Sequence, residues 1–256
     1  MIARLDERIE ELGQLKHYPD PLYYIGDKAL LKRPKISIVG SRKPTPYTRD
    51  MTALLASRLS ALGVCIVSGA AMGVDTVAHQ SALAGGTIAV MGNGLDIRYP
   101  ATNRALIEAI ERRGLVLSQF EPGFRATRWS FVVRNEIVTA LGEALIVAQA
   151  DLESGSLRSA AFAEKMGKKI FVLPHRIGES EGTDRLVKEG KAEAIYDIDA
   201  FVARFGDAAK AAEDPFLRYC RSGPSYDEAV GRFGEKVYEY ELDGKIEVVF
   251  GKIRIT

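Results

Sequence analysis

Two short Gly/Ser turns, each directly after an apolar run, hold the residues best suited to chemistry. Residues 36–39 lead into Gly40-Ser41-Arg42-Lys43-Pro44-Thr45, and residues 64–67 lead into a second turn at 68–73. A glycine there lets the backbone approach an anion, and a following helix offers unpaired N–H groups. Arg42 adds a planar fork of donors that fits phosphate oxygens. The pattern predicts a phosphate-binding edge; the alternative is an ordinary tight turn with a solvated Arg42.

Two further turns have the same character. Gly92-Asn93-Gly94 follows the apolar run at 87–91, and Ser154-Gly155-Ser156 follows the one at 144–148 and precedes a helical pattern. In the simpler interpretation, Ser156 only caps that helix. Four such turns at one edge of a sheet, however, predict an extended polar groove rather than a single pocket.

Residues 124–135 combine cations with aromatic rings. Three Arg residues and three aromatic residues are interleaved there without an acid, namely Phe124, Arg125, Arg128, Trp129, Phe131 and Arg134. Single-stranded nucleic acid is bound by cations that contact phosphates and by aromatic faces that stack on bases. The alternative is that Trp129 and Phe131 are core residues. A second basic cluster could lie nearby; it comprises Lys32, Arg33, Lys35, Arg42 and Lys43.

Several enzyme classes lack support. The chain has no Walker A loop, complete GxGxxG, HExxH or GxSxG motif. Asp75 and His79 stand four residues apart on a predicted helix, where they form either a structural pair or a catalytic couple. No third ligand accompanies them, and Cys65 and Cys220 lack metal spacing, so no metal site is expected.

Composition sets broad limits. The chain has 256 residues and a net charge of +1, so a nucleic-acid binder with this balance must segregate its charge. No apolar run approaches the roughly 20 residues that span a bilayer, and no secretory signal precedes the first strand. A cytoplasmic protein without a membrane partner is expected.

The elements that position these turns alternate regularly. Strands are predicted at 36–39, 64–67, 87–91, 115–117, 144–148 and 170–173, and helices at 47–62, 73–84, 102–113, 131–141 and 156–167. Continuous apolar strands are typical of a sheet buried on both faces. We therefore predict a doubly wound α/β fold with a mostly parallel sheet. An amphipathic helix is predicted at 2–17.

Four segments follow from this pattern. They are an N-terminal helical extension at 1–35, the α/β domain at 36–205, a linker at 206–213 and a small domain at 214–256. The small domain is predicted to contain three short helices and a hairpin around Gly251, which is the winged-helix pattern. From Glu213 to Asp243 the tail of the chain has eight acids against four bases. We expect it to contact protein, or to contact DNA only weakly.

Together these motifs resemble the DNA processing protein A family (DprA/Smf) over roughly residues 18 to 200. The matching segments are Tyr18-Pro19, 38–45, 67–75, Ala78-His79, 92–96, Tyr99-Pro100, Asn103, Arg134-Asn135, 154–157 and Pro174. The tail resembles that family's winged-helix domain, including residues 240–244. The resemblance implies a Rossmann-like sheet in the α/β domain.

That resemblance also implies a function. It implies a single-stranded-DNA-binding protein that protects incoming DNA in natural transformation, loads the RecA recombinase onto it and forms a homodimer through the Rossmann-like domain. It implies no catalytic activity and no cofactor. The DNA-binding residues implied are Gly40, Ser41, Arg42, Lys43, Thr45, Ser68, Gly69, Ala70, Ala71, Met72, Gly73, Asn93, Arg128, Phe131, Arg134, Asn135, Ser154, Gly155 and Ser156.

The chain departs from the family pattern in two places. Residues 131–135 read Phe-Val-Val-Arg-Asn where the family usually has Pro-Arg-Arg-Asn, and Ala70–Met72 lies where an Arg is common. Each change makes the groove less cationic.

Two rival functions remain. Nucleotide phosphoribohydrolases of the lysine-decarboxylase-like group share such a core, but Gly85-Gly86-Thr87 lacks their preceding Pro and following Glu. The second rival is a transcriptional regulator that uses the winged helix, and the acidic tail argues against it.

Overall fold

The computed structural model describes residues 1–205 and 215–255. The chain divides into two compact units, Met1–Ala209 and Lys210–Thr256. The linker expected at 206–213 lies outside the described residues, so the boundaries drawn there stay predictions.

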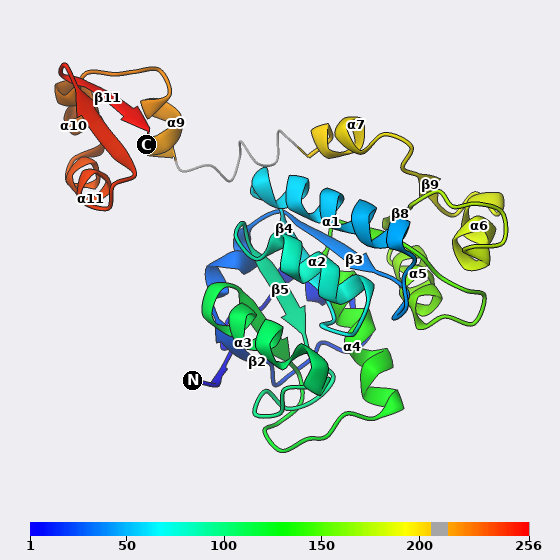
Figure 1. The fold of residues 1–256 in the computed structure, drawn as a ribbon. Helices are drawn as coiled ribbons and strands as arrows, with labels where there is room; N and C mark the ends of the chain where they lie inside the picture. Colours follow the sequence, from blue (N-terminus) through cyan, green and yellow to red (C-terminus); the bar gives the residue numbers. More distant parts are fainter. Residues whose placement is uncertain (206–214, 256) are drawn as a thin grey trace. The chain divides into compact units, whose positions relative to one another are not determined.

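The first unit is built on a nine-stranded sheet, whose strands follow the order β1-β2-β6-β5-β4-β3-β7-β8-β9 (Figure 1). The strands are β1 Ala3–Arg4, β2 Tyr23–Gly26, β3 Lys35–Val39, β4 Cys65–Ser68, β5 Thr87–Val90, β6 Leu115–Ser118, β7 Ala144–Val147, β8 Lys169–Val172 and β9 Glu193–Ala194. Only β1 and β2 run antiparallel to their neighbours, and β3 to β9 pair in parallel. The predicted mostly parallel sheet is confirmed.

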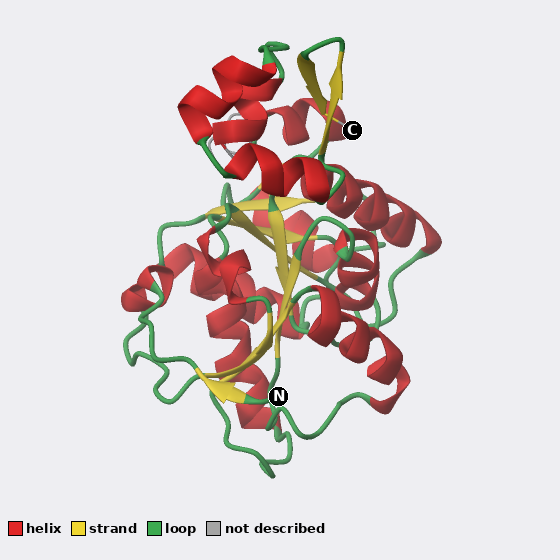
Figure 2. Ribbon diagram, turned by 90° about the vertical axis from the view of Figure 1, so that its left-hand side faces the viewer, coloured by secondary structure: helices red, strands yellow, loops and turns green. Residues whose placement is uncertain are grey.

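Helices cover both faces of this sheet, which Figure 2 views close to its edge. Apolar side chains of one face pack against α1 Pro46–Ala61, α2 Val74–Ala82, α3 Arg104–Arg113 and α7 Ile198–Ala203. Those of the other face pack against α4 Arg128–Leu141, α5 Gly155–Lys165 and α6 Glu181–Lys188. Short 3₁₀ helices are η1 Glu10–Gln14, η2 Lys28–Lys32 and η3 Ala101–Asn103. The doubly wound arrangement is therefore confirmed.

The order in which the chain adds strands to the sheet reverses between β3 and β7: β4, β5 and β6 lie on one side of β3, and β7, β8 and β9 lie on the other. β3 and β7 themselves pair in parallel at the centre of the sheet. After β3 the chain enters α1 on one face, and after β7 it enters α5 on the other. In such sheets a crevice opens beyond the carboxyl ends of the two strands, where ligands bind. The Gly/Ser turns at 40–45 and 154–156 flank this crevice.

The helix predicted at 2–17 is wrong. Only Glu10–Gln14 is helical, as the 3₁₀ helix η1, while Ala3–Arg4 forms β1. Leu5, Ile9 and Leu12 are buried in the core beside α4 and α5. Their helix-like spacing therefore reflects which residues are buried and does not indicate an α-helix. The segment 1–35 is accordingly not a helical extension, because its strand β2 pairs with β6 and extends the sheet.

The second unit has a core of its own. Its helices are α9 Pro215–Cys220, α10 Tyr226–Phe233 and α11 Lys236–Leu242, followed by the hairpin of β10 Ile246–Val249 and β11 Lys252–Ile255. Phe216, Cys220, Ala229, Val237, Ile246 and Ile253 are buried together. Three helices followed by a hairpin is the order that the winged-helix pattern predicts.

Candidate nucleic-acid interface

The first two Gly/Ser turns contact each other directly. The backbone N–H of Val74 donates to the carbonyl of Ser41 at 3.1 Å. Gly73 lies between the turns with φ of +84°, and a Cβ there would collide with the backbone of Ser41 and Arg42. Glycine is the residue that both this angle and this approach require.

Asp75 and His79, both on α2, hold the backbone of the second turn (residues 68–73) through hydrogen bonds. The Asp75 carboxylate accepts from the N–H of Gly69 at 3.2 Å and from that of Ala71 at 3.3 Å. The His79 Nε2 accepts from the N–H of Ala70 at 3.3 Å. Both side chains are buried and bound to backbone, which supports the structural interpretation of the pair over a catalytic couple.

Burial sets the protonation of this pair. Desolvation raises the pKa of Asp75, and the Arg134 guanidinium opposes that rise. Desolvation, with the same guanidinium, lowers the pKa of His79 to about 3. The hydroxyl of Thr87 donates to the Ile66 carbonyl and lies 2.7 Å from His79 Nδ1, so the neutral imidazole carries its proton on Nδ1.

Arg134 supports the same turn from α4. Its side chain is 4% exposed, and its guanidinium donates to the carbonyl of Gly69 and to that of Val90 at 3.2 Å. The guanidinium therefore braces the backbone, whereas the sequence suggested an open phosphate contact. Its Nε is buried without a hydrogen-bond partner among the described residues.

Two adjoining cavities open above these turns. The larger, here the switch-point cleft, has a volume of about 420 Å³. Its wall includes Gly40, Ser41, Arg42, Gly69, Ala71, Asp75, Arg134, Asn135, Asp151, Ser154, Gly155, Ser156 and Ser159. The smaller, here the Phe131 pocket, has a volume of about 40 Å³ and is lined by Arg42, Gly69, Ala71, Met72, Asn93, Tyr99, Phe131 and Arg134, among others. Arg42 and Arg134 lie in the wall of both.

Aromatic rings line the smaller pocket. The rings of Phe131 and Tyr99 lie 5.9 Å apart, and the Arg42 guanidinium lies 5.9 Å from the Phe131 ring. Trp129 packs edge-on against Phe120 and is 61% exposed, so it is not a core residue. Tyr99, half exposed, had only a family motif to indicate it in the sequence.

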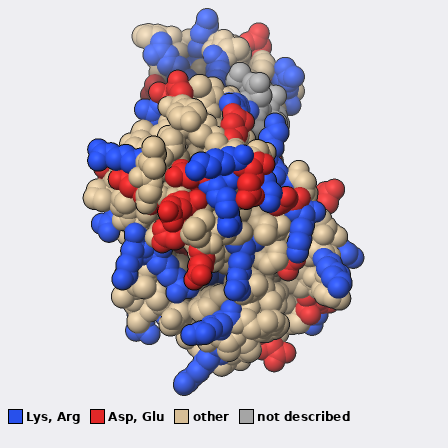
Figure 3. Space-filling model, turned by 90° about the vertical axis from the view of Figure 1, so that its right-hand side faces the viewer, with Lys and Arg blue, Asp and Glu red and all other residues tan. Residues whose placement is uncertain are grey.

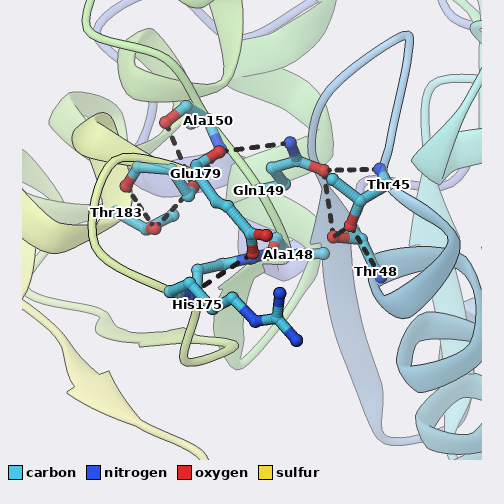
Figure 4. Close-up of polar contacts among 10 residues, drawn as sticks. Thr45, Thr48, Ala148, Gln149, Ala150, His175, Glu179 and Thr183 are labelled. Carbon is cyan, nitrogen blue, oxygen red and sulfur yellow. Dashed lines mark hydrogen bonds and ion pairs between the residues drawn. The ribbon is translucent and has the colours of Figure 1, made fainter.

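Other predicted residues position the site instead of lining it. Thr45 caps α1, and its N–H donates to the Gln149 side chain at 3.0 Å. Gln149 reaches in turn toward the Glu179 carbonyl at 3.5 Å, so loops after three strands are tied together (Figure 4). Ala70 is fully buried, with φ of +54°. Lys43 and Arg128 are exposed and border neither cavity.

The second basic cluster is divided: Arg42 lines both cavities, whereas Lys32, Arg33 and Lys35 do not join this site. Lys35 begins β3, and Arg42 follows the end of that strand, so the cluster's Lys32, Arg33 and Lys35 lie at the opposite edge. Lys35 is buried and pairs with Glu11 at 2.6 Å. On the face that carries α5 and α6, Lys and Arg side chains are interspersed with Asp and Glu (Figure 3). The charges visible on that face are therefore mixed in sign.

Sequence reasoning missed part of the cleft wall. Ser159, Asp151 and Asp75 line the cleft, but the sequence reasoning did not include them among the DNA-binding residues. Ser159 lies three residues after Ser156 on α5, so the two share one helix face. That spacing is the only signal that could have indicated Ser159.

Comparison with known proteins assigns this arrangement to a family. Residues 3–206 match the family described as DNA recombination-mediator protein A. The chain belongs to this family. The resemblance of the motifs to DNA processing protein A is thereby confirmed.

Members of the DNA recombination-mediator protein A family match most of the chain. Protein Smf of Synechocystis is 36% identical over 203 residues, which are 76% of this chain and 51% of the relative. DNA processing protein DprA of Streptococcus pneumoniae is 39% identical over 184 residues, or 70% and 65%. A structure of DNA processing protein A from Helicobacter pylori is 41% identical with a TM-score of 0.78, and covers 80% of this chain and 95% of that one. The chain thus spans about half to two thirds of the length of these curated relatives.

Residues 1–205 and 215–255 contain neither a membrane span nor a metal cluster. No helix there combines the length and the apolar character that crossing a membrane requires. No group of three or more His, Cys, Asp or Glu residues gathers there in a way that could hold a metal ion.

Proposed function

We propose that this protein binds single-stranded DNA along the Phe131 pocket and the switch-point cleft. The observation that carries the proposal is the position of Arg42. Arg42 lies in the wall of both cavities, and its guanidinium is 5.9 Å from the ring of Phe131. A cation that could contact a phosphate therefore lies between the Gly/Ser turn at 40–45 and an aromatic surface that could stack on a base. The Helicobacter pylori relative, described for its single-stranded DNA binding mode, supports the same substrate.

The described residues supply both parts of such recognition. Bases stack on exposed or half-exposed rings, here Phe131, Tyr99 and Trp129, and each stacked base contributes about 1–3 kcal/mol. Arg42, Lys43 and Arg128 are the cations available for phosphates. Arg134 and Ala70 act differently, because their side chains are buried and shape the turn.

The test is substitution of Arg42 by alanine. We expect Arg42→Ala to weaken binding of a dT oligonucleotide more than tenfold, about 1.4 kcal/mol or more, and to make the salt dependence shallower by about one counterion. Arg112→Ala is the matched control, because Arg112 is exposed at the end of α3. Fluorescence anisotropy at two salt concentrations measures both quantities. Unchanged affinity and slope in Arg42→Ala would remove the residue from the site.

The proposal includes no catalytic activity. Asp75 lines the switch-point cleft and His79 lies one turn further along α2, and both side chains accept hydrogen bonds from the backbone N–H groups of the second turn. We therefore expect no release of free base when the protein is incubated with nucleoside monophosphates. Base release that disappears on substitution within 68–73 would favour the phosphoribohydrolase rival.

The proposal extends to natural transformation, in which the protein protects incoming strands and loads the RecA recombinase onto them as a cytoplasmic homodimer. Membership of the family supports this extension. Light scattering of the purified chain tests the dimer. Stimulation of RecA ATPase activity on single strands covered by a single-strand-binding protein tests the loading, and no stimulation would contradict it.

A further inference from the structure

Two buried donors in the wall of the switch-point cleft have no partner among the described residues. They are the Ser159 hydroxyl and the Arg134 Nε, on side chains 1% and 4% exposed. A buried polar group without a hydrogen bond costs about 1–3 kcal/mol, so native proteins keep few of them. Two such groups in one cleft indicate that a ligand completes their bonding.

The N-terminus of α5 adds further donors at the same place. This helix has 11 residues, and Ser154 caps it by accepting from the N–H of Ser156. Ser156 and Ser159 lie on one face of α5, and both line the cleft. The helix terminus favours an anion, and phosphate is its common ligand.

Along the proposed path of the strand, the charges of the cleft favour one phosphate there over a run of phosphates. Asp75 and Asp151 line it together with Arg42 and Arg134, so the cations are matched by carboxylates. Successive phosphates of a polymer would meet these acids. A single phosphate followed by a sugar with a free hydroxyl would not, because a carboxylate is a usual acceptor for sugar hydroxyls at such crevices. The volume of about 420 Å³ falls within the range of small-molecule sites.

We propose that the switch-point cleft binds one nucleoside 5′-monophosphate unit. Its phosphate lies against Ser156, Ser159 and the start of α5. In a free nucleotide the 3′-hydroxyl of the sugar faces the exposed Asp151, whereas the first nucleotide of a strand has no free sugar hydroxyl. The unit is either a free nucleotide or the 5′-phosphorylated end of a strand, and the second case rests on the proposed binding of single-stranded DNA. The bases of internal nucleotides then stack on the rings beside the Phe131 pocket.

The test uses the hydroxyl that lacks a partner. Ser159→Ala removes it, and Thr52→Val is the matched control, because the Thr52 hydroxyl is also buried without a partner among the described residues but lies in α1 outside the cleft wall. Removing an unsatisfied buried group leaves stability unchanged or raises it, so both variants should fold. Melting temperatures of the full chain check this.

Four ligands separate the outcomes. Calorimetry measures dTMP, and anisotropy compares dT oligonucleotides with a 5′-phosphate, with a 5′-hydroxyl and with a 3′-phosphate of equal charge. We expect the 5′-phosphate to strengthen binding about tenfold over the other two, and Ser159→Ala but not Thr52→Val to abolish the gain. If dTMP binds about as tightly as the 5′-phosphorylated oligonucleotide, the natural ligand of the cleft is a free nucleotide. If only the 5′-phosphorylated oligonucleotide binds, the ligand is the 5′ end of a strand.

Failure of this inference is distinct from failure of the proposed function. Equal binding of the three oligonucleotides with no binding of dTMP overturns the inference and leaves single-strand binding intact. A 5′-phosphate gain that survives Ser159→Ala overturns the placement in this cleft. Absence of binding to every oligonucleotide overturns the proposed function, whereas dTMP binding lost in Ser159→Ala would still establish the cleft.

Discussion

His79 accepts a hydrogen bond from the N–H of Ala70 only while its imidazole is neutral. Burial and the Arg134 guanidinium lower its pKa to about 3, whereas an unfolded histidine titrates near about 6.5. Because the folded pKa is the lower one, the unfolded state takes up the proton first as the pH falls. The stability that neutral His79 provides is therefore complete above pH about 6.5 and is lost progressively toward pH about 3.

We predict that acidification from pH 7.5 to 5.5 lowers the free energy of unfolding, by up to about 1.4 kcal/mol per unit below pH about 6.5. Urea titrations at several pH values measure this. In His79→Gln, whose amide oxygen can accept the same bond, the slope should be shallower by about one proton. Burial raises the pKa of Asp75, so Asp75 makes the protein more stable as the pH falls, which is opposite to the effect of His79. Because both the wild type and His79→Gln contain Asp75, the difference between their slopes reports the histidine. Equal slopes would contradict the assignment.

Two glycines of the site make opposite demands. Gly73 has φ of +84° and abuts the Ser41–Arg42 backbone, whereas a Cβ added to Gly155, at the start of α5, would meet no atom within 4 Å. We predict that Gly73→Ala lowers the free energy of unfolding by more than about 1 kcal/mol, because the left-handed angle and the collision both oppose it. Gly155→Ala should be neutral or stabilising. Thermal unfolding compares them, and an unaffected Gly73→Ala would refute the contact between the turns.

At the scale of elements, α4 presents the aromatic and basic side chains. Thr127 caps it by accepting from the Ser130 N–H at 3.1 Å, and the Ser130 hydroxyl accepts from the Thr127 N–H at 2.9 Å. This reciprocal pair holds the first turn, which carries Arg128 and Trp129. The order of two proposed DNA contacts therefore depends on the cap.

We predict that Thr127→Ala lowers the free energy of unfolding by about 1 kcal/mol and weakens binding of single-stranded DNA. Asp197→Ala is the control, since Asp197 caps α7 by accepting from the Ala200 N–H at 3.0 Å, away from both cavities. It should cost similar stability without changing affinity. Chemical denaturation and anisotropy on both variants measure the two effects, and equal losses of affinity would contradict the prediction.

The elements best predicted from the sequence are those whose signal is local. Continuous Ile/Val/Leu runs placed the six central strands to within about one residue. Strands buried on both faces are apolar along their whole length, so their pattern is recognisable without knowledge of the rest of the fold. The prediction for 2–17 failed because its apolar residues Leu5, Ile9 and Leu12 are buried in the core beside α4 and α5, and this tertiary packing overrides helical spacing. Helix α4 starts at Arg128, three residues before the predicted start at 131. Its capping box pairs Thr127 with Ser130, whereas the usual sequence signal has a Glu or Gln at the second position, so the start was not recognised.

The site was predictable to the same degree. Glycines and serines after strands indicate an edge, because the carboxyl ends of parallel strands meet there. Nothing local distinguishes Arg134, which is buried, from Arg128, which is exposed, since this depends on how α4 lies over β4 and β5. The same holds for Ser159, which lines the cleft only through the packing of α5.

At the scale of the whole molecule, each unit has its own core. The three clusters of the first unit involve residues up to Phe205, and the cluster of the second lies within 216–253. We predict that a chain ended after Phe205 unfolds cooperatively and keeps its affinity for dT oligonucleotides. Calorimetry and anisotropy test this, and a tenfold loss of affinity would assign DNA contacts to the acidic tail. Full-length protein should also bind duplex DNA more weakly than single strands at physiological salt.

Both outer strands of the nine-stranded sheet are very short. β1 spans Ala3–Arg4 and β9 spans Glu193–Ala194, and the charged side chain of Glu193 pairs with Arg204 at 2.7 Å. Long flat edges invite another chain to add a strand, and short charged edges resist it. The first unit is thereby guarded against edge-to-edge aggregation. Among the described residues, neither edge offers a second copy of the chain a ladder of useful length, so we expect the proposed dimer to join through helices or loops.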